Sequence, residues 1–263
     1  MGDISQKTLG AIYGDLLHVD NSNNGVTTTL KDLKSGEGTV SCVSISDDAA
    51  LVKPQNDDTS TTFKVSSLGG TALFTVDSTN SKVSALGNYI NTQYAYFSIG
   101  YTESTNFATD THQAIPFQSA NYGLLTFPPA FCTGTDPATT FTTSDGNGTR
   151  ASDIVACMWY VSDNISIDSV TSIEGADVAT GDTTRMHLFS YTFNSGSTSC
   201  LASGTLLAHN SDVTNAGNEQ AYLSTWTVDS ASVTAGKVIL AFFRSDSINS
   251  DYTVNIKVKY HLT

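Results

Sequence analysis

The fold is decided by residues 252–262, which have the sequence Tyr-Thr-Val-Asn-Ile-Lys-Val-Lys-Tyr-His-Leu. Apolar or aromatic residues stand at every second position from Tyr252 to Leu262, and polar residues stand between them. Because successive side chains of a strand point to opposite faces, this alternation predicts an antiparallel strand with one buried and one exposed face. The preceding stretch, residues 238–243, is apolar at every position and predicts a central strand that is buried on both faces.

Similar stretches recur through the second part of the chain, separated by turns rich in Gly, Asn, Asp and Ser. The candidate strands are residues 93–101, 122–127, 154–161, 186–193, 221–228, 237–244 and 252–262. No stretch between them shows the 3.6-residue period of a helix. Short strands with such turns predict an all-β fold, with an antiparallel β-sandwich head domain, jelly-roll-like, over residues 89–263.

Residues 26–88 have a different character, with shorter strands and few large apolar residues. Candidate strands lie at residues 40–45, 63–65, 72–76 and 82–83, and Gly69-Gly70 supplies one of the turns. Strands this short cannot build the core of a monomeric domain. We therefore expect a thin β segment, a shaft or collar, in which identical neighbouring chains supply the missing contacts.

Residues 1–25 are expected to form a short N-terminal helix that serves as an anchor. Its apolar residues recur with a period near 3.6, and those on the expected attachment face are Leu9, Ile12, Leu16 and Leu17. Gly10 and Gly14 each weaken such a helix by about 1 kcal/mol relative to alanine, so it needs a surface to pack on. Folding back onto its own domain is the alternative.

Charge and composition exclude several classes of protein. The formal net charge is −13, and nucleic-acid binding depends on Lys and Arg that neutralise phosphates, so we expect no nucleic-acid partner. No apolar window is long enough to span a bilayer and the N-terminus lacks the pattern of a signal peptide, so we expect no membrane insertion and no export. Four cysteines stand far apart without CxxC spacing, which disfavours zinc and favours buried free thiols, with one disulfide as the alternative. We expect neither a metal nor a cofactor.

Catalytic constellations are also missing from the sequence. The five histidines fall in separate segments, outside any Gly-x-Ser-x-Gly or His-Glu-x-x-His pattern. The pair Asp47-Asp48 is adjacent, and adjacent strand residues point to opposite faces, so this pair cannot flank a glycosidic bond by itself. We therefore expect that the chain is not an enzyme.

One stretch resembles a known family. Residues 63–87 have the sequence Phe-Lys-Val-Ser-Ser-Leu-Gly-Gly-Thr-Ala-Leu-Phe-Thr-Val-Asp-Ser-Thr-Asn-Ser-Lys-Val-Ser-Ala-Leu-Gly. This sequence resembles a phrase that recurs in the fibre proteins of tailed bacteriophages, where two strands, a Gly turn and a Thr-Asn turn repeat along a trimeric shaft. Residues 14–23 and 45–48 also look like the virion-facing part of such fibres. The later residues match only the general plan of a β-sandwich head on a short shaft.

The resemblance implies a homotrimeric structural protein of the virion, assembled in the host cytoplasm. It would be a tail fibre or receptor-binding protein that attaches to a host surface glycan or protein. Its N-terminal residues would hold another virion structural protein. A head fibre or capsid decoration protein is the alternative in the same class. A glycan-degrading tailspike is the alternative from another class, and the absence of a long repetitive solenoid argues against it.

Receptor contacts are expected in the loops of the head, because strands hold the scaffold and loops are free to vary. The two long connections are residues 133–152 and 210–218, both rich in Thr, Asn, Asp and Gly. The receptor-binding candidates in them are Asp145, Asn147, Thr149, Asn210 and Asn215. The aromatic residues that could stack on sugar rings, if they are not part of the core, are Tyr94, Tyr96, Phe97, Tyr101, Trp159, Tyr160 and Trp226.

Overall fold

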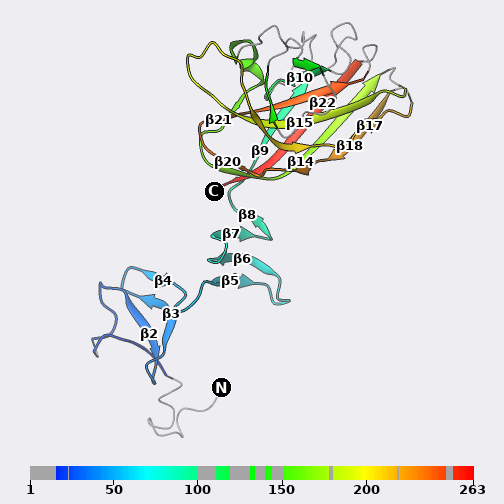
Figure 1. Ribbon diagram of the computed structural model, residues 1–263. Coiled ribbons are helices and arrows are strands. Elements are labelled where there is room, and N and C mark those ends of the chain that lie inside the picture. The colour runs from blue at the N-terminus through cyan, green and yellow to red at the C-terminus, as the bar shows by residue number, and fades with distance from the viewer. Residues whose placement is uncertain are drawn as a thin grey trace. The chain divides into compact units, whose positions relative to one another are not determined.

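The computed structural model describes residues 16–22, 24–99, 111–118, 131–133, 140–143, 151–177, 180–217, 219–246 and 251–263. The chain divides into two compact units, Met1–Ile90 and Asn91–Thr263 (Figure 1). The strand pairings of the described residues are all antiparallel, and the helical segment η4, Ala151–Cys157, is a short 3-10 helix. The prediction of an all-β, antiparallel fold is confirmed.

The first unit contains two four-stranded sheets, each a simple meander in chain order. One sheet is formed by β1 (Leu17–Val19), β2 (Lys31–Ser35), β3 (Val40–Ile45) and β4 (Ala50–Val52). The other is formed by β5 (Phe63–Ser66), β6 (Ala72–Asp77), β7 (Lys82–Ala85) and β8 (Asn88–Tyr89). The two-residue turn between β7 and β8 has positive φ at both Leu86 (49°) and Gly87 (82°), as in the tight turns that match strand twist.

The prediction of a helix within residues 1–25 is wrong at Leu17–Val19, which form a strand. Leu17 begins strand β1 and pairs with Ser35 of β2, while Leu16 precedes the strand. Pairing with β2 satisfies the backbone groups of this stretch, whereas a helix interrupted by two glycines offers less. Leu9 and Ile12 lie outside the described residues.

The described part of the second unit is built on eight principal strands. They are β9 (Thr92–Ile99), β10 (Thr111–Ile115), β14 (Ile165–Asp177), β15 (Thr183–Thr192), β16 (Gly204–His209), β18 (Gln220–Thr225), β21 (Lys237–Ser245) and β22 (Asp251–Leu262). The shorter strands are β11 (Phe131–Thr133), β12 (Thr140–Phe141), β13 (Trp159–Tyr160), β17 (Val213–Thr214), β19 (Thr227–Val228) and β20 (Ser232–Val233).

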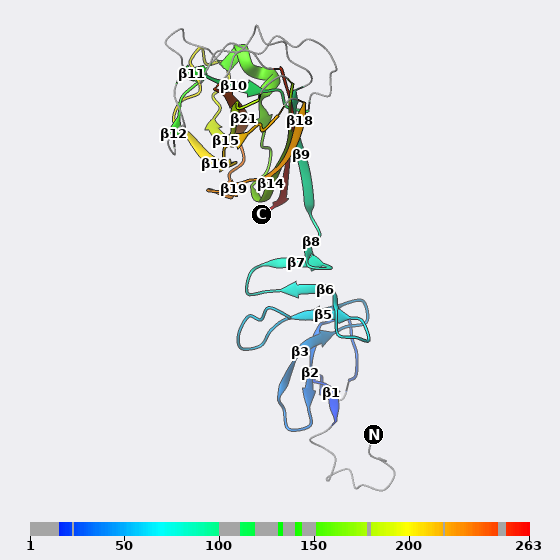
Figure 2. The same ribbon diagram turned by 90° about the vertical axis from the view of Figure 1, so that its right-hand side faces the viewer.

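These strands form two sheets that pack face to face, visible as two layers in Figure 2. One sheet has the order β11-β10-β21-β15-β16-β12 and the other the order β18-β14-β22-β9. The principal strands pair in reverse chain order: β9 with β22, β10 with β21, β14 with β18, and β15 with β16. The first half of the unit is thus wound against the second half.

The core of the second unit follows the sequence patterns. Alternate residues of β22, among them Ile256 and Val258, are fully buried between the two sheets. In β21, Ala241 faces this inter-sheet core, while Phe242 belongs to a second cluster on the opposite face of its sheet, where η4 packs. The prediction that residues 238–243 form a central strand buried on both faces is therefore confirmed.

Candidate functional site

The sheet β5–β8 has one apolar face and one polar face. Cross-strand register places Phe63 opposite Val76, and Val65 opposite Phe74, on the same face. The apolar side chains of that face are Phe63, Val65, Phe74, Val76, Val83 and Ala85, with Asn88 at its edge. The other face consists of Lys64, Leu73, Thr75, Asp77, Lys82, Ser84 and Tyr89, and it is polar apart from the exposed Leu73 and the Tyr89 ring. The Lys82 ammonium lies 4.3 Å from the centre of the Tyr89 ring, on the polar face.

The apolar face has no covering layer within the described part of the unit. Phe63 and Val65 are each 44% exposed, although Phe63 contacts Phe74 edge to face with ring centroids 6.2 Å apart. No residue of this face is buried. Because contiguous apolar surface of this kind is rare on monomers, this face is a candidate assembly surface.

The sheet β1–β4 repeats this arrangement. Its register puts Val19 opposite Leu33 and Val43 opposite Val52, and all four side chains are only half-buried. Among the described residues of the first unit, Ser44 alone is buried, and its hydroxyl donates a 2.7 Å hydrogen bond to Asp32 Oδ1 on the neighbouring strand. Within the described residues, both sheets of the first unit therefore have paired strands but no buried apolar interior.

A further exposed face lies on the second unit, on the outer side of the sheet β18-β14-β22-β9. Ile173 and Leu223 are cross-strand partners there and are 56% and 75% exposed. Tyr94 and Tyr96 of β9 share this side and are also exposed, with the Lys257 ammonium 5.8 Å from the centre of the Tyr94 ring. This face combines aliphatic, aromatic and cationic side chains.

The structure places two of the four predicted anchor residues. Leu17 is 70% exposed on β1, and Leu16 before it is half-buried. Both are at least partly accessible to another molecule, but Leu17 begins a strand and Leu16 precedes it, so neither is part of a helix. A role in virion attachment stays a prediction for Leu9, Ile12, Leu16 and Leu17.

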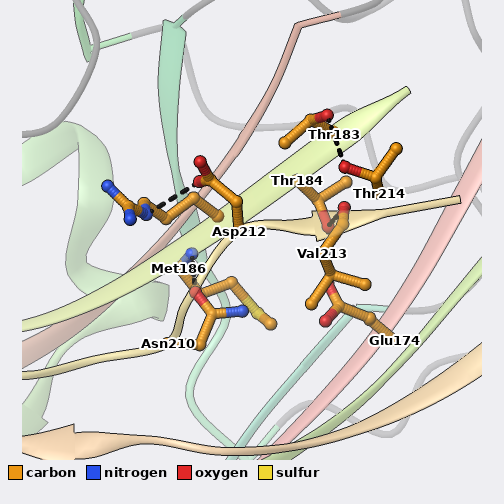
Figure 3. A network of polar contacts seen from close by, with 9 residues as sticks. Glu174, Thr183, Thr184, Met186, Asn210, Asp212, Val213 and Thr214 are labelled. Carbon is orange, nitrogen blue, oxygen red and sulfur yellow. Dashed lines mark hydrogen bonds and ion pairs between the residues drawn. The ribbon is translucent and has the colours of Figure 1, made fainter. Parts of the chain in front are cut away.

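Of the predicted receptor-binding residues, Asp145, Asn147 and Thr149 lie outside the described residues. Asn210 is 1% exposed, and its Oδ1 accepts a 2.7 Å hydrogen bond from the backbone N–H of Met186 (Figure 3). Asn215 is 4% exposed, and its Oδ1 accepts a hydrogen bond from the Tyr222 hydroxyl. These two asparagines lie inside the second unit, and their role in receptor binding stays a prediction.

Further contacts bind the segment around Asn210 to the start of β15. The Arg185 guanidinium forms a 2.9 Å ion pair with Asp212, and the hydroxyls of Thr183 and Thr214 are 3.0 Å apart (Figure 3). Backbone pairing of β17 with β15 adds to these contacts. The segment is therefore held in place like part of the sheet, which sequence composition alone does not reveal.

Glu174 is a buried carboxyl group at this end of the sandwich. Its Oε2 accepts a 2.7 Å hydrogen bond from the Thr184 hydroxyl, and its Oε1 accepts one of 3.1 Å from Ser224. Burial raises the pKa of Glu174, and the two hydroxyl donors partly oppose this rise because they stabilise the carboxylate. The neighbouring cavity, lined also by Tyr222 and Tyr252, has a volume of only about 10 Å³, which is room for about one water molecule.

The structure also brings together histidines that are distant in sequence. The ring centroids of His112 and His187 are 5.2 Å apart, and those of His187 and His209 are 6.5 Å apart. Burial, together with the coulombic effect of neighbours that include His112 and Arg185, lowers the pKa of His187 to about 2. His187 is therefore uncharged at neutral pH.

The prediction of buried free thiols is correct for Cys157 and wrong for Cys42. Cys157 is buried, and burial raises the pKa of its thiol to about 12, which makes it unreactive at neutral pH. Cys42 is instead exposed on β3, and Cys200 is half-buried. All three are free thiols.

The aromatic residues separate into core and surface. Phe97, Trp159 and Trp226 are at most 7% exposed, whereas Tyr94, Tyr96 and Tyr160 are at least 43% exposed. Tyr101 lies outside the described residues. A recess of about 90 Å³ opens beside Trp159, and residues that the sequence did not single out line it: Gln93, Ser162, Asp163 and Tyr260. Alternation placed Tyr260 on the buried side of its strand, but no sequence signal brings Asp163 close to Gln93.

Among the described residues, no helix is long and apolar enough to cross a membrane. No family model matches the chain, and no curated protein matches it.

Proposed function

We propose that this chain is a homotrimeric structural protein of a tailed-phage virion, a tail fibre or receptor-binding protein that mediates attachment to the host. The observation that carries this proposal is the uncovered apolar face of β5–β8. Phe63, Val65 and Phe74 share that face; the first two are exposed and Phe74 is half-buried, so the sheet has no core of its own. Identical chains around a common axis would cover it.

The energetic argument is simple. Burying one side chain of the size of Val or Phe is worth about 1.5 to 3 kcal/mol, and the face offers Phe63, Val65, Phe74, Val76 and Val83 from each chain. Each chain carries a formal charge of −13, so a trimer concentrates three times that charge. Apolar burial must offset this repulsion, and high salt, which screens repulsion, should leave the assembly intact. The number of three chains rests on the resemblance to phage fibre shafts.

The winding of the second unit supports a recognition head. The reverse pairing of β9 with β22, β10 with β21, β14 with β18 and β15 with β16 is the pairing of a jelly roll. Viral capsid and lectin domains use this architecture. The likeness concerns the fold alone and does not extend to a binding site. The proposed role is assembly and binding, without catalysis. Residues 1–25 would attach to another virion protein, and the head would contact a host glycan or protein.

Two measurements test the proposal. Light scattering on the purified full chain at micromolar concentration should give three times 27.8 kDa, at low and at high salt alike. A stable monomer would contradict the assembly. Antibodies against the chain should label the tails of phage particles in electron micrographs. Labelling at capsid vertices would favour the head fibre alternative, and particles without label would overturn the virion role.

A further inference from the structure

The aromatic recess lies at one open end of the two-sheet head. It is bordered by β13 and the residues that follow it, and by the paired ends of β9 and β22, where Gln93 stands opposite Tyr260. Its volume of about 90 Å³ is below the several hundred Å³ of a pocket that encloses a whole small molecule. The recess can therefore take one edge of a ring and leaves the rest of a ligand in water.

The floor of the recess is aromatic and held firmly. Trp159 is 7% exposed and lies between two other rings, with centroids 5.9 Å from Phe117 in a stacked arrangement and 4.9 Å from Tyr260. Backbone pairing with Ile239 of the central strand β21 fixes the position of Trp159. A floor of this kind keeps its shape when a ligand arrives, which lowers the entropic cost of binding.

The rim of the recess is polar and offers both a donor and an acceptor. The Tyr260 hydroxyl donates a 2.9 Å hydrogen bond to Gln93 Oε1, which orients the Gln93 side chain and leaves its Nε2 as a donor. On the other side, Ser162 Oγ donates a 2.9 Å hydrogen bond to Asp163 Oδ2, which leaves Asp163 Oδ1 as an acceptor. Both Gln93 and Asp163 are exposed to solvent.

We propose that this recess is a binding subsite for a neutral sugar residue. The apolar C–H side of a sugar ring would lie against the Tyr260 ring, which packs on Trp159 beneath it, and the sugar hydroxyls would accept from Gln93 Nε2 and donate to Asp163 Oδ1. A hydroxyl both donates and accepts, so the mixed rim suits it better than it suits an anion. The Asp163 carboxylate, on a chain with a formal charge of −13, repels phosphate and acidic sugars.

This inference deepens the proposed function, because it names the class of host ligand that the head would contact. One open subsite gives weak binding, in the millimolar range, and three linked copies on one particle would raise the avidity. None of the residues that line the recess belongs to 133–152 or 210–218, the stretches in which loop composition led us to expect the receptor contacts.

The test uses the fluorescence of the full chain. The chain has two tryptophans, and Trp226→Phe leaves Trp159, the floor of the recess, as the only indole. The probes are lactose, maltose, cellobiose and N-acetylglucosamine, each titrated to about 100 mM, well above a millimolar Kd. We expect at least one of them to change the Trp159 emission with saturation, and galacturonate to bind at least 10-fold more weakly than the best neutral sugar.

Surface variants locate the binding. Asp163→Ala and Gln93→Ala should each raise the Kd of the best sugar about 10-fold or more, whereas Asp57→Ala, an exposed acid of the first unit, should leave it unchanged. The inference is overturned if no neutral sugar perturbs Trp159, if galacturonate binds as well, or if the rim variants bind like the Asp57→Ala control. Each result is independent of the oligomeric state and of virion labelling, so it can fail while the proposed function holds.

Discussion

The two units of the chain use the same antiparallel strands but obtain stability in different ways. In the second unit two sheets bury each other, so that Phe97, Leu188 and Ile256 are fully inaccessible to solvent. In the first unit the sheet β5–β8 also has an amphipathic pattern, yet no residue of its apolar face is buried. The comparison teaches that alternation specifies which face is to be buried but not what buries it. For the first unit we propose that other molecules supply the missing layer.

Separating the units gives the largest expected effect. Residues 91–263 should fold alone and unfold cooperatively, because both hydrophobic clusters lie within them. Residues 1–90, at concentrations too low for association, should lack cooperative unfolding. Thermal unfolding followed by circular dichroism checks both fragments. If residues 1–90 unfolded cooperatively as a monomer, the proposed difference between the two units would be wrong.

A charge on the apolar face of the first unit should prevent assembly. Phe74→Asp puts a carboxylate into the proposed interface, where burial of an unpaired charge is costly, and the full chain should become monomeric at micromolar concentration. The matched control is Thr75→Asp, the next residue of the same strand, which points to the polar face and should leave the trimer intact. Light scattering distinguishes the two. Equal behaviour of both variants would show that the apolar face is not the interface.

A methyl group at Gly204 should destabilise the second unit alone. A Cβ built at Gly204 would lie 2.4 Å from the ring of buried Tyr191, so Gly204→Ala must displace that ring and should cost about 1 to 3 kcal/mol of unfolding free energy. Gly69→Ala is the control in the first unit, because its nearest neighbouring atom would be 3.9 Å away. Denaturant unfolding of the two variants measures the difference. Equal stability would mean that the core around Tyr191 is loosely packed.

Local patterns predicted much of this fold, and non-local contacts account for what they missed. The alternation in residues 252–262 and the apolar run at 238–243 identified β22 and β21, because periodicity records burial directly. The helical period at Leu16 and Leu17 was misleading, since pairing with β2 depends on residues further along the chain. Polar composition around Asn210 resembled a free loop, although its side chain accepts a hydrogen bond from Met186 on β15, the strand that pairs with β16. The recess also depends on distant parts of the chain.

The smallest expected effect concerns the pH dependence of the second unit. Burial raises the pKa of Glu174 above its ordinary value of 4.5, so over the interval between the two values the folded state keeps a proton that the unfolded state has lost. The stability contributed by this proton is fully present below pH 4.5 and is lost as the pH rises through the pKa of the folded state. Glu174→Gln cannot ionise, and its amide can still accept from Thr184 and donate to Ser224. We therefore expect the Tm of the wild type, relative to that of Glu174→Gln, to fall as the pH rises from about 4 to about 8. The control is Glu219→Gln at an exposed position, whose Tm should change with pH in parallel with that of the wild type. If the Tm of Glu174→Gln also ran parallel to that of the wild type, the Glu174 carboxyl would be ionised throughout this pH range, and the prediction would be wrong.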